Sequence, residues 1–105
     1  MIKYKYNGQE YMLEFDRASV EILEKTGFSM GTFTDHIATM QPLLFRGAFF
    51  KNHKFAKNLD YEKMWDEVKN KKKFTNALLD MVAETYQTLM ADEETDEGNE
   101  NWEVV

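Results

Sequence analysis

The sequence contains no cysteine, and this absence excludes disulfide bonds and thiol chemistry. It also lacks a long apolar run, since no stretch approaches the length of a membrane-spanning helix. The first residues form no apolar signal region. We therefore expect an intracellular, soluble protein with no membrane partner, and 105 residues suffice for one domain with a modest core.

Basic residues are missing from one end of the chain. Residues 92–105 hold seven of the 19 acidic side chains and none of the 13 Lys and Arg. Residues 1–91 therefore hold 12 acids and 13 bases, a balance of +1. This layout predicts a nearly neutral folded domain over residues 1–91 and a flexible, disordered acidic tail over residues 92–105.

The first segment, residues 2–15, has the pattern of a β-hairpin. Asn7-Gly8 is a preferred two-residue turn because both positions tolerate positive φ. Pairing around this turn places Tyr4 opposite Tyr11 and Lys5 opposite Glu10, so that alternate apolar residues share one face. Because a lone hairpin is marginal in water, we expect this face to pack on helices.

Helices are predicted over most of the remaining chain. Asp16 is a suitable N-cap for a helix over residues 17–26, with Ala18, Ile22 and Leu23 toward the core. A short helix through Met40 follows, with its cap at residue 32 or 34. The fold class is mainly α (α+β), an N-terminal hairpin packed on about four to five helices.

The single proline lies at the start of the most apolar stretch, residues 42–53. Proline is favoured at the first position of a helix and disfavoured inside one. We therefore predict a break near Gln41 and a central helix that begins at Pro42. Gly47 in that helix costs about 1 kcal/mol relative to alanine. It is interpreted either as a helix crossing or as a tolerated glycine.

The apolar side chains of this stretch fall almost all the way round a helix, which predicts either a core helix or one pressed against a partner. We expect Leu44, Phe45 and Ala48 to be core residues, and Phe49 and Phe50 to form a contact surface.

Two further helices are predicted. Asp60 caps a helix from Tyr61 to about residue 70, and Leu59 and Met64 fit a hydrophobic staple. A last helix continues to about residue 91. The basic run at residues 69–73 either breaks the chain or opens this last helix.

No catalytic or metal motif stands out. His36 and His53 are the only histidines and have no cysteine companions, so no metal or other cofactor is predicted. Asp16 and Asp60 are explained as helix caps, and Glu84 as part of an ordinary amphipathic helix. The sequence therefore indicates a non-enzymatic protein.

Two basic clusters, one in residues 51–57 and one in residues 69–73, have aromatic neighbours. Such interleaving occurs in proteins that bind single-stranded nucleic acid. A balance of only +1 in residues 1–91 gives weak attraction to phosphate, so nucleic acid is not the favoured partner. A small regulatory or nucleic-acid-directed protein remains the alternative function.

Seven methionines and an apolar chain end point instead to protein partners. Methionine is flexible and suits adaptable binding surfaces. The tail ends in apolar residues that can dock by strand addition or into a groove. The candidate partner-binding residues are Met40, Phe49, Phe50, Met64, Trp102, Val104 and Val105. The sequence leaves open whether the protein forms a homo-oligomer.

Five features occur in order along the chain: the hairpin, a helix that ends Glu24-Lys25-Thr26-Gly27, the block at residues 43–53, a terminal helix with Glu84-Thr85-Tyr86, and an acidic tail that closes in Asn101-Trp102-Glu103-Val104-Val105. This layout resembles the small tail assembly chaperones of siphophages, particularly those of phages and prophages of Gram-positive bacteria. The likeness covers most of the chain.

This resemblance implies a non-enzymatic role in the host bacterial cytoplasm during virion assembly. Such chaperones bind and solubilise the tape-measure protein before the tail tube polymerises, and they are absent from the mature virion. In many phages a frameshifted longer form recruits the tail tube protein, and this sequence would be the short form.

Overall fold

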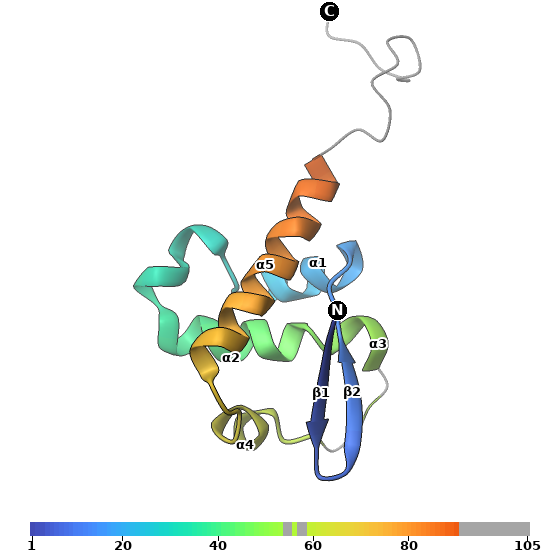
Figure 1. Cartoon of the computed structure of the whole chain (residues 1–105). Coiled ribbons are helices and arrows are strands. Elements are labelled where there is room, and N and C mark those ends of the chain that lie inside the picture. Colours follow the sequence, from blue (N-terminus) through green and yellow to red (C-terminus); the bar gives the residue numbers. More distant parts are fainter. Residues whose placement is uncertain (54–55, 57–58, 91–105) are drawn as a thin grey trace, which may run out of the picture.

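A computed structural model describes residues 1–53, 56 and 59–90, and within these residues it contains a hairpin, five α-helices and one 3₁₀ helix (Figure 1). The predicted mainly α (α+β) class is therefore confirmed. The acidic tail predicted for residues 92–105 lies outside the described residues. The elements are β1 Ile2–Tyr6, β2 Gln9–Leu13, α1 Arg17–Lys25, η1 Met30–Asp35, α2 Ile37–Gly47, α3 Phe50–His53, α4 Tyr61–Asp66 and α5 Lys71–Met90.

The hairpin has the predicted register. Tyr4 pairs with Tyr11 and Lys5 with Glu10, and the turn residues Asn7 and Gly8 have φ angles of 50° and 78°. Two consecutive residues with positive φ match the right-handed twist of the strands, which is why Asn-Gly is favoured at this position.

One face of the hairpin packs on the helices, as expected. The ring of Tyr4 lies edge-on to Phe45 at a centroid distance of 5.5 Å, and Tyr11 lies 5.5 Å from Phe49. The hydroxyl of Tyr4 donates to the carbonyl of Met64. These contacts join the hairpin to the middle and the later part of the chain.

Helix α1 begins as predicted but buries a different face. Asp16 accepts the backbone N–H of Ser19, and the Ser19 hydroxyl accepts the N–H of Asp16 in return, which forms a capping box. The expectation that Ala18 and Ile22 face the core is wrong, because both are exposed. The buried residues are Ser19, Val20 and Leu23, since this is the face on which α2, α3 and α5 pack.

The break predicted at Gln41 is absent, because α2 continues through Pro42. Proline removes the hydrogen bond that its missing N–H would give to the carbonyl of Ala38, and its ring crowds that carbonyl. Burial of Met40, Leu44 and Phe45 on both sides of the proline holds the helix together. The predicted helix through Met40 is replaced by η1 and the first turn of α2.

The predicted central helix over residues 42–53 is instead two helices, α2 and α3, separated by Ala48 and Phe49. The carbonyl of Ala48 accepts the N–H of Glu14 at 3.1 Å, so it leaves the helical pattern to hold the end of β2. Gly47 marks a helix crossing, since a Cβ atom there would lie 2.7 Å from Cδ1 of Leu23.

The last two helices differ in how well they were predicted. Asp60 caps α4 by accepting the N–H of Lys63, as expected, but α4 ends at Asp66 rather than near residue 70. The basic run at residues 69–73 does both things that were considered for it: residues 69 and 70 lie in the break after α4, and Lys71 begins α5.

Helix α2 is the centre of the fold, since it packs against η1, α1, α4 and α5. No helix within the described ranges is both long and apolar enough to cross a membrane. The buried apolar residues form one core, drawn from the hairpin, the helices and their connections: Leu13, Phe15, Val20, Leu23, Phe28, Phe33, Met40, Leu44, Phe45, Ala48, Phe49, Met64, Trp65, Val68, Leu78 and Val82.

Candidate partner-binding surface

Phe49, one of the two phenylalanines expected at a contact surface, is a core residue. Its side chain has no exposed surface, so it does not form the surface that was expected of it. Its ring lies 5.1 Å from Phe45 and 5.1 Å from Tyr61, with both pairs edge-on. The hairpin on one side and the chain around α4 on the other enclose it.

The other candidates are divided by burial. Met40 and Met64 are 7% and 1% exposed, so both pack in the core. Phe50 is only half-buried. Leu44, Phe45 and Ala48 are fully buried, as expected. Trp102, Val104 and Val105 lie outside the described residues, and their role stays a prediction.

The exposed apolar surface lies elsewhere on the molecule. Two of the exposed residues, Leu89 and Met90, end helix α5, whose last turns project beyond the other described elements (Figure 1). Among the residues that the structure describes, the large apolar side chains that remain exposed are Met1, Ile22, Met30, Ile37, Leu89 and Met90.

An open groove runs beside the second half of α5, and we call it the Met30 groove. Its volume is about 450 Å³. Ala83 and Tyr86 form its α5 side, while the chain between α1 and η1 forms the other side. Its lining residues are Glu24, Phe28, Ser29, Met30, Ala83 and Tyr86. Four of these six are apolar, and Met30 is 39% exposed, so the groove offers an adaptable apolar surface to a partner.

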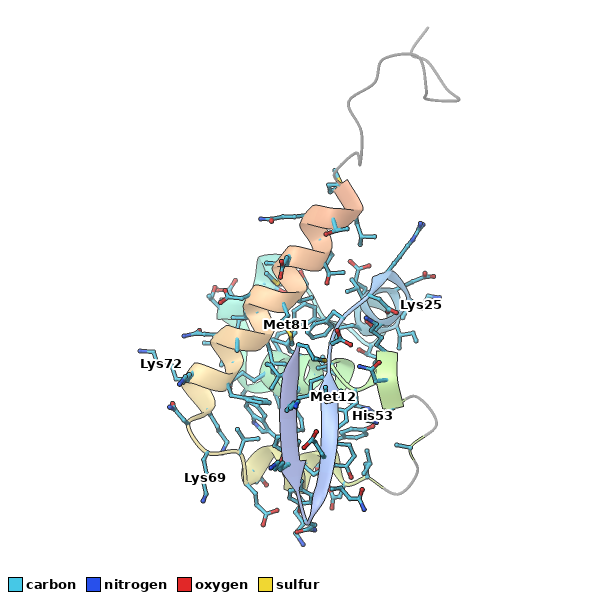
Figure 2. All side chains as sticks on the ribbon, turned by 45° about the vertical axis from the view of Figure 1, so that its right-hand side comes forward. Met12, Lys25, His53, Lys69, Lys72 and Met81 are labelled. Carbon is cyan, nitrogen blue, oxygen red and sulfur yellow. The ribbon has the colours of Figure 1, made fainter. Side chains whose placement is uncertain are left out.

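A second hollow, which we call the Met81 groove, lies between α5 and the chain around β2 and α1. It is more polar and has a volume of about 430 Å³. Met81 lies on the α5 side (Figure 2). The lining residues are Met1, Glu14, Phe15, Asp16, Arg17, Met81, Glu84, Thr85, Thr88 and Leu89. Three carboxylates beside one Arg make this groove acidic.

Tyr86 links the Met30 groove to α1. Its hydroxyl donates a hydrogen bond to Oε2 of Glu24 at 3.1 Å. Burial of the ring, together with this bond to a carboxylate, raises the pKa of Tyr86 to about 12. The tyrosine therefore stays protonated at neutral pH and keeps α5 tied to α1 at this groove.

The outer edge of β2 is closed by the α3 region. The N–H of Met12 donates to Nε2 of His53 at 2.9 Å, and Nδ2 of Asn52 donates to the carbonyl of Met12 at 3.1 Å (Figure 2). His53 therefore accepts with Nε2, which places its ring proton on Nδ1. The same amide of Asn52 also bonds Glu14, and this bond lowers the pKa of the Glu14 carboxyl.

The acidic residues singled out from the sequence have the following positions in the fold. Within residues 1–53, 56 and 59–90, no three His, Asp or Glu side chains come close enough to hold a metal ion. Asp16 and Asp60 serve as helix caps, as predicted. Glu84 is exposed at the Met81 groove.

Two lysines of the basic clusters interact with other residues of the domain. Nζ of Lys71 donates to the carbonyls of Asp66 and Val68, and Nζ of Lys51 lies 3.5 Å from a carboxylate oxygen of Glu14. Lys69 and Lys72 extend outward near the beginning of α5 (Figure 2).

The Met30 groove was missed by reasoning from the sequence. Residues 28–31 lie between two predicted helices and show no binding motif, and Ala83 carries no sign of its place at a surface. One signal was present, since the apolar pattern of the last helix extends to Leu89 although no predicted element remains to cover it.

The sequence model of one family, described as "Domain of unknown function (DUF5055)", matches residues 1–105. No curated protein and no solved structure matches the chain.

Proposed function

The chain belongs to the DUF5055 family, whose function is unknown, and we propose that it is a phage tail assembly chaperone, a non-enzymatic protein that binds and solubilises the tape-measure protein. The proposal takes its client from the resemblance to siphophage chaperones. It includes action in the host bacterial cytoplasm during assembly and absence from the mature virion.

The observation that carries the proposal is the Met30 groove beside the projecting end of α5. Amphipathic helices bind by laying an apolar face in such a groove, with anchors one or two turns apart. Met30 and Tyr86 supply flexible and aromatic contacts in the groove, and Leu89 adds apolar surface on the neighbouring side of α5. A client rich in apolar helices would gain shielding from water at this site.

The binding site proposed from the structure differs from the contact surface expected at Phe49 and Phe50. Phe45 and Phe49 have no exposed surface with which to contact a client. The contact residues are instead Met30, Ala83, Tyr86 and Leu89, and Phe50 is a peripheral candidate. The docking of a frameshifted longer form on the tail tube protein is part of the same proposal.

Co-expression with the tape-measure protein of the same phage or prophage genome tests this function. We expect the chaperone to move that protein from the insoluble to the soluble fraction and to copurify with it. Met30→Asp should abolish most of this effect, because it places a charge in the apolar groove.

Ile37→Asp is the matched control. Ile37 is 47% exposed against 39% for Met30, but it lies at the beginning of α2 and not in the Met30 groove. The control variant should solubilise the client as the unmodified chain does. If the tape-measure protein stays equally insoluble with and without the unmodified chain, the proposed function is wrong.

A further inference from the structure

The two edges of the hairpin differ in how the described residues cover them. His53 and Asn52 satisfy the outward N–H and carbonyl of Met12 on β2. Met12 pairs with Lys3. In an antiparallel ladder, pairs that bond each other alternate with pairs whose backbone N–H and carbonyl groups point away from the partner strand, and Met12 and Lys3 form a pair of the second kind. The backbone groups of Lys3 therefore point outward from β1, and those of Lys5 do so two residues further on.

No described residue pairs with this β1 edge. Within residues 1–53, 56 and 59–90, no backbone or side-chain group bonds the outward N–H groups of Lys3 and Lys5. An open strand edge is a template for another strand. Exposed lysines on β1 disfavour pairing with a basic segment and favour a segment with an acidic side chain on the same face.

We propose that the C-terminal residues of this chain, Asn101–Val105, add to β1 as a third strand of the sheet. The period of two matches on both faces. Trp102 and Val104 would continue the half-buried face of β1, which carries Ile2, Tyr4 and Tyr6. Glu103 would lie on the exposed face beside Lys3 and Lys5, where opposite charges stabilise neighbouring strands.

The connection is long enough. Leu89 and Met1 line the same groove, so the end of α5 lies near the beginning of β1. Ten residues, 91–100, precede the terminal strand and span about 33 Å when extended. The five residues of β1 are about 17 Å long, so the segment can reach either end of the strand.

Charge favours this edge over the two grooves. The Met81 groove holds Glu14, Asp16 and Glu84, and the Met30 groove holds Glu24. An acidic tail would be repelled from both. Lys3 faces uncharged Met12 across the hairpin, which leaves its charge available to the tail. The inference is independent of the proposed chaperone function.

Amide hydrogen exchange of the full chain, followed by NMR, tests the inference. We expect the N–H of Lys3 or Lys5 to exchange about tenfold more slowly in the unmodified chain than in a variant that carries both Glu103→Pro and Val104→Pro, because one of two consecutive N–H groups must face β1 in either strand orientation. The control variant with Thr95→Pro and Asp96→Pro alters the tail outside the terminal strand and should retain the protection.

Two additional measurements sharpen the result. Lys3→Glu should weaken the protection of Lys5, whereas Lys72→Glu, which makes the same change of charge on α5, should leave it unchanged. Contacts of the Trp102 ring with Tyr4 or Tyr6 are expected in the same spectra.

Three results would overturn the inference. The first is fast exchange of both Lys3 and Lys5 in the unmodified chain. The second is contact of Trp102 with Phe28 or Met30, which would place the tail in the Met30 groove. The third is protection that disappears on dilution, because pairing would then occur between two copies rather than within one chain.

Discussion

At the scale of single residues, Phe49 shows how burial decides between two uses of the same side chain. The sequence offers adjacent phenylalanines without indicating which one is enclosed. In the fold, Phe49 has no exposed surface and contacts aromatic rings on several sides, whereas Phe50 is half-buried. We therefore infer that Phe49 stabilises the fold and does not contact a partner.

We predict that Phe49→Ala destabilises the domain by about 3–5 kcal/mol, the usual cost of deleting a buried aromatic side chain. Phe50→Ala should cost clearly less, because its side chain already contacts water. Urea denaturation followed by circular dichroism measures both free energies of unfolding. Equal costs at the two positions would contradict this assignment.

At Gly47, α2 lies close to α1. An added Cβ would lie 2.7 Å from Cδ1 of Leu23, a side chain that is itself fully buried. Gly47→Ala should therefore destabilise by about 1–3 kcal/mol through overpacking, although alanine is the better helix former.

A double-mutant cycle measures whether Leu23 causes this cost. In a Leu23→Ala background the added methyl group has room, so Gly47→Ala should cost much less or become stabilising. An unchanged cost in that background would mean that Leu23 is not the obstacle.

Tyrosine ionisation gives a prediction about alkaline pH. The hydrogen bond to Glu67 raises the pKa of Tyr6 to about 12, and burial with the bond to Glu24 does the same for Tyr86. The unfolded chain loses these protons near pH 10. Because the folded state binds more protons between pH 10 and 12, the free energy of unfolding should fall across this window, and the contribution is fully present below pH 10.

Replacing both tyrosines with phenylalanine should make this fall shallower. A part should remain, since burial also raises the pKa of Tyr4 and of Tyr61. Urea denaturation at a series of pH values measures the slope. The same slope in the double variant and the unmodified chain would refute the assignment.

At the scale of elements, the sequence predicted the hairpin turn and two helix caps correctly, because in each of them residues close together in the chain interact. Asn7-Gly8, Asp16 and Asp60 each act within three residues of their own position, so the sequence contains the whole interaction. The boundaries of α2, α3 and α4 depend on distant partners. The carbonyl of Ala48, for example, leaves the helical pattern for Glu14, which is far away in the sequence.

Pro42 is an exception among the local signals. Proline usually ends or kinks a helix, but α2 continues through it because the residues on both sides are packed in the core. We predict that Pro42→Ala raises the stability of the domain by about 1–2 kcal/mol. The interior proline costs about 3 kcal/mol, and its restriction of the unfolded chain returns up to about 1 kcal/mol. Thermal and urea unfolding measure the change, and a loss of stability would mean that the ring itself packs favourably.

At the scale of the whole molecule, the sequence predicted the fold class but not the surface. A hairpin and about five helices follow from turns, caps and apolar spacing. The Met30 groove joins η1 to α5, which begin about 40 residues apart, and local patterns do not encode which helix covers which face. The same limit explains why Ile22 was expected in the core and is exposed.

The central claim is that the client occupies the Met30 groove and the end of α5. Hydrogen exchange with mass spectrometry, on the copurified complex and on the free protein, tests it most directly. The account predicts slower exchange on binding in residues 24–30 and 83–90, with residues 44–49 unchanged because they are already buried. Protection confined to other segments, such as 50–53 or 69–73, would contradict it.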